Sequence, residues 1–404
     1  MTHTRLLFLD GLRGILALIV FLHHFFYAFF PEIVFGGDLQ SYVQSGPFSV
    51  YKIWALTPLN ILFNPGTAIH FFFLISGYVQ SYHYFSSNDF TFLQRSFIKR
   101  YFRLAIPTLF VLLLVFLFHQ FAWFQLSLIP NNTLSGNWVK GLCPNNQNLF
   151  DVIMSGIYGS FMGKTQYYPI LWTMPAELQN SFMVLILLMI THGSKHKSRL
   201  FVFWLVVQLV VFNGYYSAAF TCGLILAKFR IQSPAFVQFF FKKPVQWCCC
   251  LIGLYFGSYP YTGYEHSTSH SVYNPISFFD KIPHLISFLI GSVFLLLFFL
   301  HSNKMQSIFA KKQLVWFGKL SFMFYLLHFL ILLSFTPWMY RLFAVSLSRG
   351  SALSLSLTLS FILITLLSHF FTKWIDGPTF KICDWINKKI SGENQRLNNT
   401  KAAQ

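Results

Sequence analysis

The sequence predicts an all-α, polytopic integral membrane protein with about ten transmembrane helices and with both its N-terminus and its C-terminus in the cytoplasm. The composition is the first observation behind this prediction. Hydrophobic residues make up 55% of the 404 residues, only 10% are charged, and 52 are phenylalanine. A soluble chain of this length needs far more charge to cover its surface.

The second observation is a series of apolar stretches. A helix needs about 20 mostly apolar residues to cross a bilayer, and ten stretches reach or approach that length. They are about 14–30, 61–82, 104–124, 171–191, 200–213, 216–228, 245–258, 283–300, 317–335 and 351–371. The fifth to seventh are short. The two that flank Asn213 and Gly214 are also compatible with one long, kinked element.

The third observation is the placement of basic residues, which are enriched in cytoplasmic loops of membrane proteins. If the N-terminus is inside, only six of the 29 Lys and Arg residues fall in segments expected outside, namely Lys52, Lys140, Lys164, Lys281, Arg341 and Arg349. This bias supports both the number of spans and the cytoplasmic termini. It also accounts for the net charge of +18 without a nucleic-acid partner, because no soluble segment is long enough for a basic domain.

The predicted organisation is one membrane domain over residues 1–391, followed by a polar cytoplasmic tail over 392–404. The six cysteines form no Cys-x-x-Cys pair and no His/Cys cluster at metal-ligand spacing, so no metal is expected. No targeting signal selects a particular cellular membrane.

Ionisable residues within a span are costly and usually functional, and the first span contains Arg13, His23 and His24. Arg13 and His24 are eleven residues apart, which places them within about 20° of one helix face and about 16 Å apart along the axis. His24 is thereby expected near mid-bilayer, whereas His23 points about 100° away. A histidine can take up and return a proton near neutrality. On this pattern alone, two hydrogen-bonded packing histidines fit equally well.

Five segments occur in an order that points to a family. They are Leu9–Gly14 followed by His24, Phe71–Tyr78, Lys99–Arg103 followed by Pro107, Leu171–Leu178, and Gly318–Ser321 followed by Tyr325–His328. The first resembles the Arg, ten residues, His motif of the membrane acyltransferase-3 family, the O-acetyltransferase-like proteins. The others are similar to that family's Phe-rich second helix, Arg-x-x-Arg entry to the third helix, Leu-Trp-Thr…Glu segment and ninth-helix Tyr-Leu-Leu-His motif.

Each motif is weak by itself, but together they span nearly the whole chain. One departure occurs near the last helix, where the family commonly has an acidic residue, then Lys or Arg, then Pro. This chain has Asp376-Gly377-Pro378, which retains the acid without the base and leaves the role of that element open.

The resemblance implies transfer of an acyl group, usually acetyl, from cytoplasmic acyl-CoA (acetyl-CoA) to a hydroxyl, often on a carbohydrate. His24 would act as general base, and Arg13 would orient the donor or stabilise developing charge. An acyl-histidine intermediate and the acyl chain length both stay open. The implied partners are the lipid bilayer, acyl-CoA and a hydroxyl-bearing acceptor such as a glycan or a lipid-linked sugar.

Two further pairs of residues are candidates for binding. Arg100 and Arg103, one helical pitch apart at the inner surface, suit the phosphates of coenzyme A, although without the family they are ordinary membrane anchors. Glu177, near the outer end of the fourth span, is assigned with Ser76 to substrate binding. The alternatives are an ion pair between Glu177 and another helix, and close helix packing at Ser76-Gly77.

The remaining histidines His70, His119, His328 and His369 are interpreted as packing residues, and His328, within a family motif, is the first exception to test. Two other functions compete with acyl transfer. A multi-pass transporter for a small polar or anionic solute fits the spans, but the chain has no inverted repeat. A catalytically inactive relative that acts as an interaction partner fits the Arg13–His24 spacing poorly.

Overall fold

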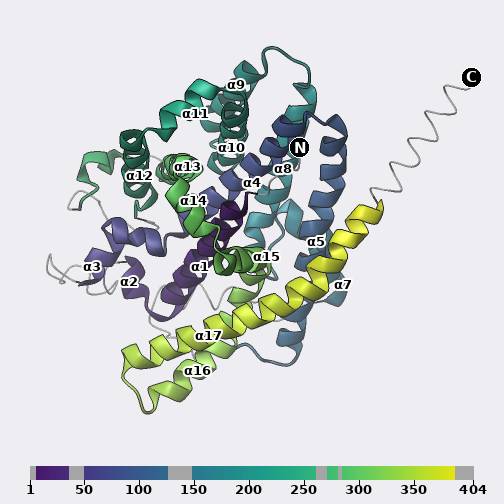
Figure 1. Cartoon of the computed structure of the whole chain (residues 1–404). Helices are drawn as coiled ribbons and strands as arrows, with labels where there is room; N and C mark the ends of the chain where they lie inside the picture. The colour runs from purple at the N-terminus through teal and green to yellow at the C-terminus, as the bar shows by residue number, and fades with distance from the viewer. Residues whose placement is uncertain (1–5, 36–49, 126–147, 261–270, 281–283, 387–404) are drawn as a thin grey trace, which may run out of the picture.

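The computed structural model describes residues 6–35, 50–125, 148–260, 271–280 and 284–386. Throughout these ranges the regular structure is helical, no strand occurs, and the helices gather into one bundle (Figure 1). The boundary expected at residue 391 lies outside the described residues. The all-α fold class is therefore confirmed for the part of the chain that the structure describes.

A helix covers each of the ten segments that the sequence predicts as spans. These helices are α1 (Leu7–Phe29), α4 (Pro65–Ser87), α5 (Phe90–Gln120), α8 (Thr173–Ile190), α9 (Lys197–Val210), α10 (Tyr215–Gln232), α12 (Lys243–Gly257), α13 (Leu285–His301), α15 (Lys312–Leu333) and α17 (Arg349–Phe371). Shorter helices lie between them: α2 (Pro31–Phe35), α3 (Val50–Ala55), α7 (Leu149–Ile157), α11 (Pro234–Phe241), α14 (Asn303–Phe309) and α16 (Phe335–Ala344).

Local signals explain where two of the central helices begin. The side chain of Asn64 accepts hydrogen bonds from the backbone of Gly66 and Thr67, and Pro65 occupies the first position of α4, where its missing N–H has no cost. Asp89 accepts a hydrogen bond from the backbone of Thr91 and so caps α5. These caps satisfy N–H groups that the first helical turn leaves without partners.

Among the described residues, only five helices are long and apolar enough to cross a membrane by themselves. They are Leu7–Phe29, Phe90–Gln120, Pro169–Ile190, Lys312–Leu333 and Arg349–Ile386. A sixth results if α13 and α14, which meet at 94°, count as one broken span. The other expected spans are shorter or, like α4, contain several polar residues, so length and apolarity do not establish ten crossings.

The two short helices α9 and α10 form an antiparallel hairpin and not one kinked element. Asn213 between them has a left-handed backbone, with φ +48°. The side chains of Gln208 and Thr221 are hydrogen-bonded at 2.8 Å near the turn, and Lys228 donates to Ser198 at the far end. As the residue number rises in α9, from Ser198 to Gln208, the number of the partner in α10 falls, from Lys228 to Thr221. The two helices therefore run in opposite directions.

Close contact between α1 and α15 aligns two of the family-like motifs. A Cβ atom on Gly318 would overlap the backbone carbonyl of Asp10, and one on Gly14 would lie 2.9 Å from the backbone nitrogen of Gly318. Further along, the rings of Phe21 and Phe324 lie 5.7 Å apart. Since residue numbers rise together in both helices, α1 and α15 run parallel, and only glycine permits this approach.

We expect Gly318→Ala to disturb this alignment, because the new methyl group meets backbone atoms that cannot rotate away. The matched control is Gly350→Ala, since a Cβ at Gly350 would have no neighbour within 4 Å. Gly318→Ala should lower the melting temperature of the purified protein by several degrees, corresponding to about 1–3 kcal/mol. Equal melting temperatures for the two variants would contradict this account of the helix contact.

A second parallel contact joins α4 and α10. A Cβ on Gly77 would overlap the carbonyl of Phe220, and one on Gly223 would overlap that of Leu74. The rings of Phe73 and Phe220 stack with centroids 5.3 Å apart. The Ser76-Gly77 motif thus brings α4 against α10 through its glycine, while Ser76 has other partners described below.

The chain continues as a helix beyond α17 through a π-helical turn over Thr372–Asp376. The backbone N–H of Gly377 bonds the carbonyl of Thr372, five residues earlier. Pro378 lacks an N–H, and its ring would clash with a carbonyl four residues earlier in a regular α-helix, which accounts for the wider turn. The following residues reach α5, where Asp384 pairs with Lys99 at 2.7 Å.

Candidate active site

Two histidines from helices far apart in the sequence meet inside the bundle. The Nε2 atom of His328 on α15 lies 3.2 Å from the Nδ1 atom of His24 on α1. His328 is 1% exposed, and the ring of Phe329 packs edge-on against His24 at 5.4 Å. Because α1 begins at Leu7 and ends at Phe29, His24 lies closer to the end of the helix than to its middle.

Carbonyl partners determine which nitrogen of each ring carries the proton. The Nδ1 atom of His328 lies 2.5 Å from the carbonyl oxygen of Tyr325. A carbonyl can only accept, so this Nδ1 is protonated and the Nε2 of His328 is an acceptor. The Nδ1 atom of His24 lies 2.9 Å from the carbonyl oxygen of Val20 and is protonated for the same reason. It donates to Val20 and toward His328, which leaves Nε2 as the basic nitrogen of the His24 imidazole.

Tyr325 fixes the helical turn that carries His328. Its hydroxyl donates to the carbonyl oxygen of Ile170 at 2.6 Å and lies 2.9 Å from the Oγ1 atom of Thr173. Tyr168 adds a second tie, because its hydroxyl donates to the carbonyl oxygen of Leu326 at 2.8 Å. The segment that enters α8 therefore holds α15 in place, and with it the orientation of the histidine pair.

A second polar cluster joins α4, α5 and α8. Arg100 donates through Nη2 to the Oε1 atom of Glu177 and through Nε to the hydroxyl of Ser181 at 2.9 Å. Ser76 donates to the same Oε1 atom of Glu177 at 2.9 Å, and Gln80 donates to the carbonyl of Ser181 at 3.3 Å. The side chains of Arg100 and Glu177 are only 20% and 16% exposed.

This cluster lies halfway along α4, because Ser76 is equally distant from Pro65 and Ser87 at its two ends. Arg100 and Glu177 therefore meet beside the middle of α4, although Glu177 itself belongs to the first turns of α8. A single sequence gives positions along one helix only, and the contact between these helices follows here from the bonds that join them.

One face of α8 connects the two clusters. Thr173, Glu177 and Ser181 follow one another at intervals of four residues and so lie on the same face. Thr173 contacts Tyr325 of the histidine cluster, whereas Glu177 and Ser181 hold Arg100. A continuous series of polar side chains thus extends from His24 to Arg100 through the interior of the bundle.

The structure does not bring the predicted arginines together as one phosphate clamp. Arg103 is exposed, and its guanidinium lies 4.8 Å from the ring centroid of Phe380, beyond α17. Arg13 lies 3.9 Å from Asp10 on its own helix, and its side chain is 25% exposed. Arg100 and Arg103 are therefore held by different partners, which the shared helical pitch did not reveal.

Breaking the Arg100–Glu177 pair should destabilise the protein, because Glu177→Ala leaves the Arg100 cation in the interior without its carboxylate. The expected loss is about 3 kcal/mol, seen as a fall in melting temperature. The matched control is Asp384→Ala, which breaks the exposed pair with Lys99 and should cost about 1 kcal/mol or less. If the two variants melt alike, the interior pair has no special role in stability.

Sequence reasoning missed the contact between His328 and His24, although a signal was present. His24 follows Gly14 by ten residues, and His328 follows Gly318 by ten residues. Two parallel helices that touch at Gly14 and Gly318 must bring the two histidines to the same level. No group of three or more His, Cys, Asp or Glu residues within the described ranges is placed to hold a metal ion.

Comparison with known proteins finds acyltransferases that match almost the whole chain. A family model described as an acyltransferase domain matches residues 6–372. A protein of Cochliobolus lunatus named as an acyltransferase is 24% identical over 461 aligned residues, which cover 95% of this chain and 96% of the relative. A second, from a Phoma species and also named as an acyltransferase, is 22% identical and covers 96% of each chain. No solved structure matches the chain.

Proposed function

Because the chain belongs to the acyltransferase domain family, we propose that it moves an acyl group, typically acetyl, from cytoplasmic acyl-CoA to a hydroxyl group of a carbohydrate acceptor. The activity as an acyltransferase and the multi-pass location in a membrane follow from the family and its relatives. The donor, the catalytic base and the acceptor are the proposal.

The observation that carries the proposal is the arrangement of the histidine pair. Val20 and His328 hold the Nδ1 side of His24, so the ring has one orientation and one favoured tautomer. Its Nε2 atom is then a preformed general base, which is what the activation of a hydroxyl group requires. A histidine that served packing alone would not need a second acceptor beside the carbonyl of Val20 to orient its ring.

The proposed reaction starts when Nε2 of His24 takes the proton from the acceptor hydroxyl. The oxygen forms a bond to the thioester carbonyl carbon, and the carbon–sulfur bond then breaks. The imidazolium returns its proton to the leaving thiolate, so the products are an ester and free coenzyme A. If transfer passes through an acyl-histidine, the same Nε2 atom is the nucleophile.

On the donor side, Arg13, Arg100 and Arg103 are proposed to contact the acyl-CoA at successive depths. Arg103 is exposed and suits the nucleotide phosphates. Arg100 uses two of its N–H groups on Glu177 and Ser181 and has others to offer an extended pantetheine arm. Ser76 and Glu177 form the wall of the substrate path and orient this guanidinium, while Arg13 lies on the same face of α1 as His24.

We also propose ten crossings with cytoplasmic termini, and helix directions support this topology. α1 and α15 run parallel, as the first and ninth spans must. α4 and α8 run parallel as well, since Ser76 pairs with Glu177 and Gln80 with Ser181, and α10 has the same direction. α9 is antiparallel to α10, as neighbouring spans have to be.

The test is mass spectrometry of glycans and lipids from cells with and without the protein, combined with coenzyme A release by the purified protein. Deletion should remove one class of acylated molecule, and acetyl-CoA should yield free thiol only when an acceptor is present. If deletion leaves every acyl ester in place and no thiol is released, the proposed donor and acceptor are wrong.

A further inference from the structure

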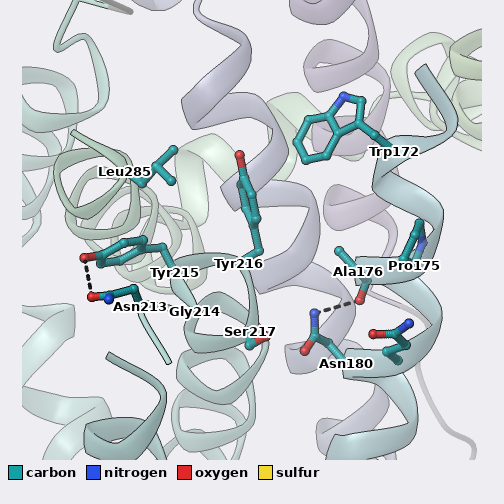
Figure 2. A pocket seen from close by; sticks show the side chains of 11 residues that line it. Trp172, Pro175, Ala176, Asn180, Asn213, Gly214, Tyr215, Tyr216, Ser217 and Leu285 are labelled. Atoms are coloured by element: carbon teal, nitrogen blue, oxygen red, sulfur yellow. Dashed lines mark hydrogen bonds between the residues drawn. The ribbon is translucent and has the colours of Figure 1, made fainter. Parts of the chain in front are cut away.

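A cavity of about 330 Å³ lies beside the polar interior, where α8, α10 and α13 begin. Figure 2 shows its lining, with Trp172, Pro175, Ala176 and Asn180 on one side and the Asn213–Ser217 turn opposite them. Trp172 extends from the start of α8 toward Tyr216, which rises from the start of α10 (Figure 2), and Leu285 of α13 completes the lining.

Among the residues that the structure describes, the lining has amide and aromatic groups and no acidic or strongly basic side chain. Gln179, Asn180 and Asn213 supply amides, and Ser217 supplies a hydroxyl. An amide side chain both donates and accepts hydrogen bonds, and so does a hydroxyl group. The amides of the lining therefore suit a ligand that carries hydroxyl groups. A charged ligand would lose water here without gaining a counter-charge, so the lining favours a neutral ligand with several hydroxyl groups.

The aromatic side of the cavity is preformed. The rings of Trp172 and Tyr216 lie 5.4 Å apart at an angle of 53°. Behind Tyr216, the buried ring of His70 lies at 4.8 Å and that of Phe73 at 5.7 Å. Flat aromatic faces held in this way suit the carbon-bound hydrogens on one side of a saturated ring.

The amides of the cavity are also held in position. Asn180 donates through Nδ2 to the carbonyl of Ala176 at 2.8 Å, so its side-chain oxygen remains an acceptor. Asn213 has a left-handed backbone, and its side-chain oxygen accepts from the hydroxyl of Tyr215 at 3.4 Å. Groups that are held before a ligand arrives give affinity without a further loss of side-chain entropy.

The cavity adjoins the proposed reaction site through the start of α8. Trp172 faces the cavity, and the next residue, Thr173, contacts Tyr325 of the histidine cluster at 2.9 Å. Ala176 and Asn180 continue the cavity face of α8, while Glu177 and Ser181 continue the face toward Arg100. The cavity and the histidine cluster thus meet at the start of α8, where the adjacent residues Trp172 and Thr173 face the one and the other.

We propose that this cavity binds the acceptor and that the acceptor presents a neutral sugar ring, with Trp172 and Tyr216 against its carbon face and Asn180 and Asn213 on its hydroxyl groups. The inference rests on the proposed function, because it assigns the acceptor of that reaction. It makes Trp172 and Asn180 determinants of specificity, and it separates them from Ser76 and Glu177 in the interior.

The experiment uses the full chain in lipid nanodiscs and two matched probes, octyl glucoside and octyl glucuronide, which adds one carboxylate. Equilibrium binding of tritiated octyl glucoside is compared for the wild type, Trp172→Ala, Asn180→Ala and the control Trp338→Ala, whose tryptophan is exposed on α16. Both cavity variants should weaken binding about tenfold, Trp172→Phe should recover most of it, and the control should bind as the wild type does.

The glucuronide should bind the wild type at least about tenfold more weakly than the glucoside. Where the glucoside is acylated, the cavity variants should raise its KM by a similar factor and leave kcat nearly unchanged. Equal binding of the glucoside to the wild type and to Trp172→Ala, or no binding to either, overturns the assignment of the cavity, whatever the rate of acyl transfer. Absence of acyl transfer together with cavity-dependent binding would instead count against the proposed reaction and leave the assignment of the cavity supported.

Discussion

Replacing His24 by alanine should lower kcat for acyl transfer by about 10²–10⁴-fold, because the reaction then lacks its general base. His24→Gln should be as inactive, since glutamine keeps the size and polarity of the residue but cannot take up a proton near neutrality. The measurement is acetyl-CoA-dependent release of free thiol by purified protein, together with detection of the acylated acceptor.

A second buried histidine provides the matched control. The Nδ1 atom of His301 lies 2.8 Å from the carbonyl oxygen of Leu297, four residues earlier, as His24 does with Val20. Aromatic rings surround His301, with Phe240 at 5.4 Å and Phe241 at 5.3 Å. His301→Gln should therefore keep its activity once the folded fraction is taken into account. A well-folded His24→Gln variant with full activity would exclude His24 as the base.

Replacing His328 should produce the second large effect. His328→Leu removes one of the two acceptors that face Nδ1 of His24, so the ring keeps only its bond to Val20 and is held less firmly in its orientation. We expect kcat to fall by about 10²-fold, since loss of orientation in a histidine that acts as general base is costly. KM for acyl-CoA and for the acceptor should change little, because His328 contacts neither substrate in this mechanism.

Rescue by a conservative change distinguishes positioning from packing. His328→Gln places an amide oxygen close to the position of the lost Nε2 atom and so restores an acceptor. It should recover a large part of the kcat that His328→Leu loses, although both variants change the volume of the site. If the two variants are equally impaired, or if both are fully active, His328 does not orient His24.

The sequence predicted those features of the site that depend on one helix. The spacing of Arg13 and His24 follows from the geometry of α1 alone, and the family-like motifs identified both the class of enzyme and the helices that carry its polar residues. An ion pair of Glu177 with another helix was one of two alternatives, and Arg100 was not identified as its partner, because that contact depends on how α4, α5 and α8 pack together.

Residues that face each other across helices were harder to predict. His328 was given a packing role because no property of α15 alone shows which helix lies opposite it. The cavity next to Trp172 depends on the α9–α10 hairpin, and hydropathy could not distinguish that hairpin from one bent helix. Gly14 and Gly318 held the missing information, but they reveal it only when α1 and α15 are placed side by side.

The equal spacing from glycine to histidine in α1 and α15 limits which changes of length the chain can tolerate. An extra residue between Gly14 and His24 turns His24 by about 100° and moves it about 1.5 Å along the axis. An extra residue in α15 does not compensate for this rotation, because it turns His328 about the axis of α15 and so moves that ring away from α1 as well. Only paired insertions of about seven residues, or two turns, bring both rings back to the shared face. The distance from the glycine contact to the histidine pair is thus the same in both helices, and natural variation in length should be confined to the loops.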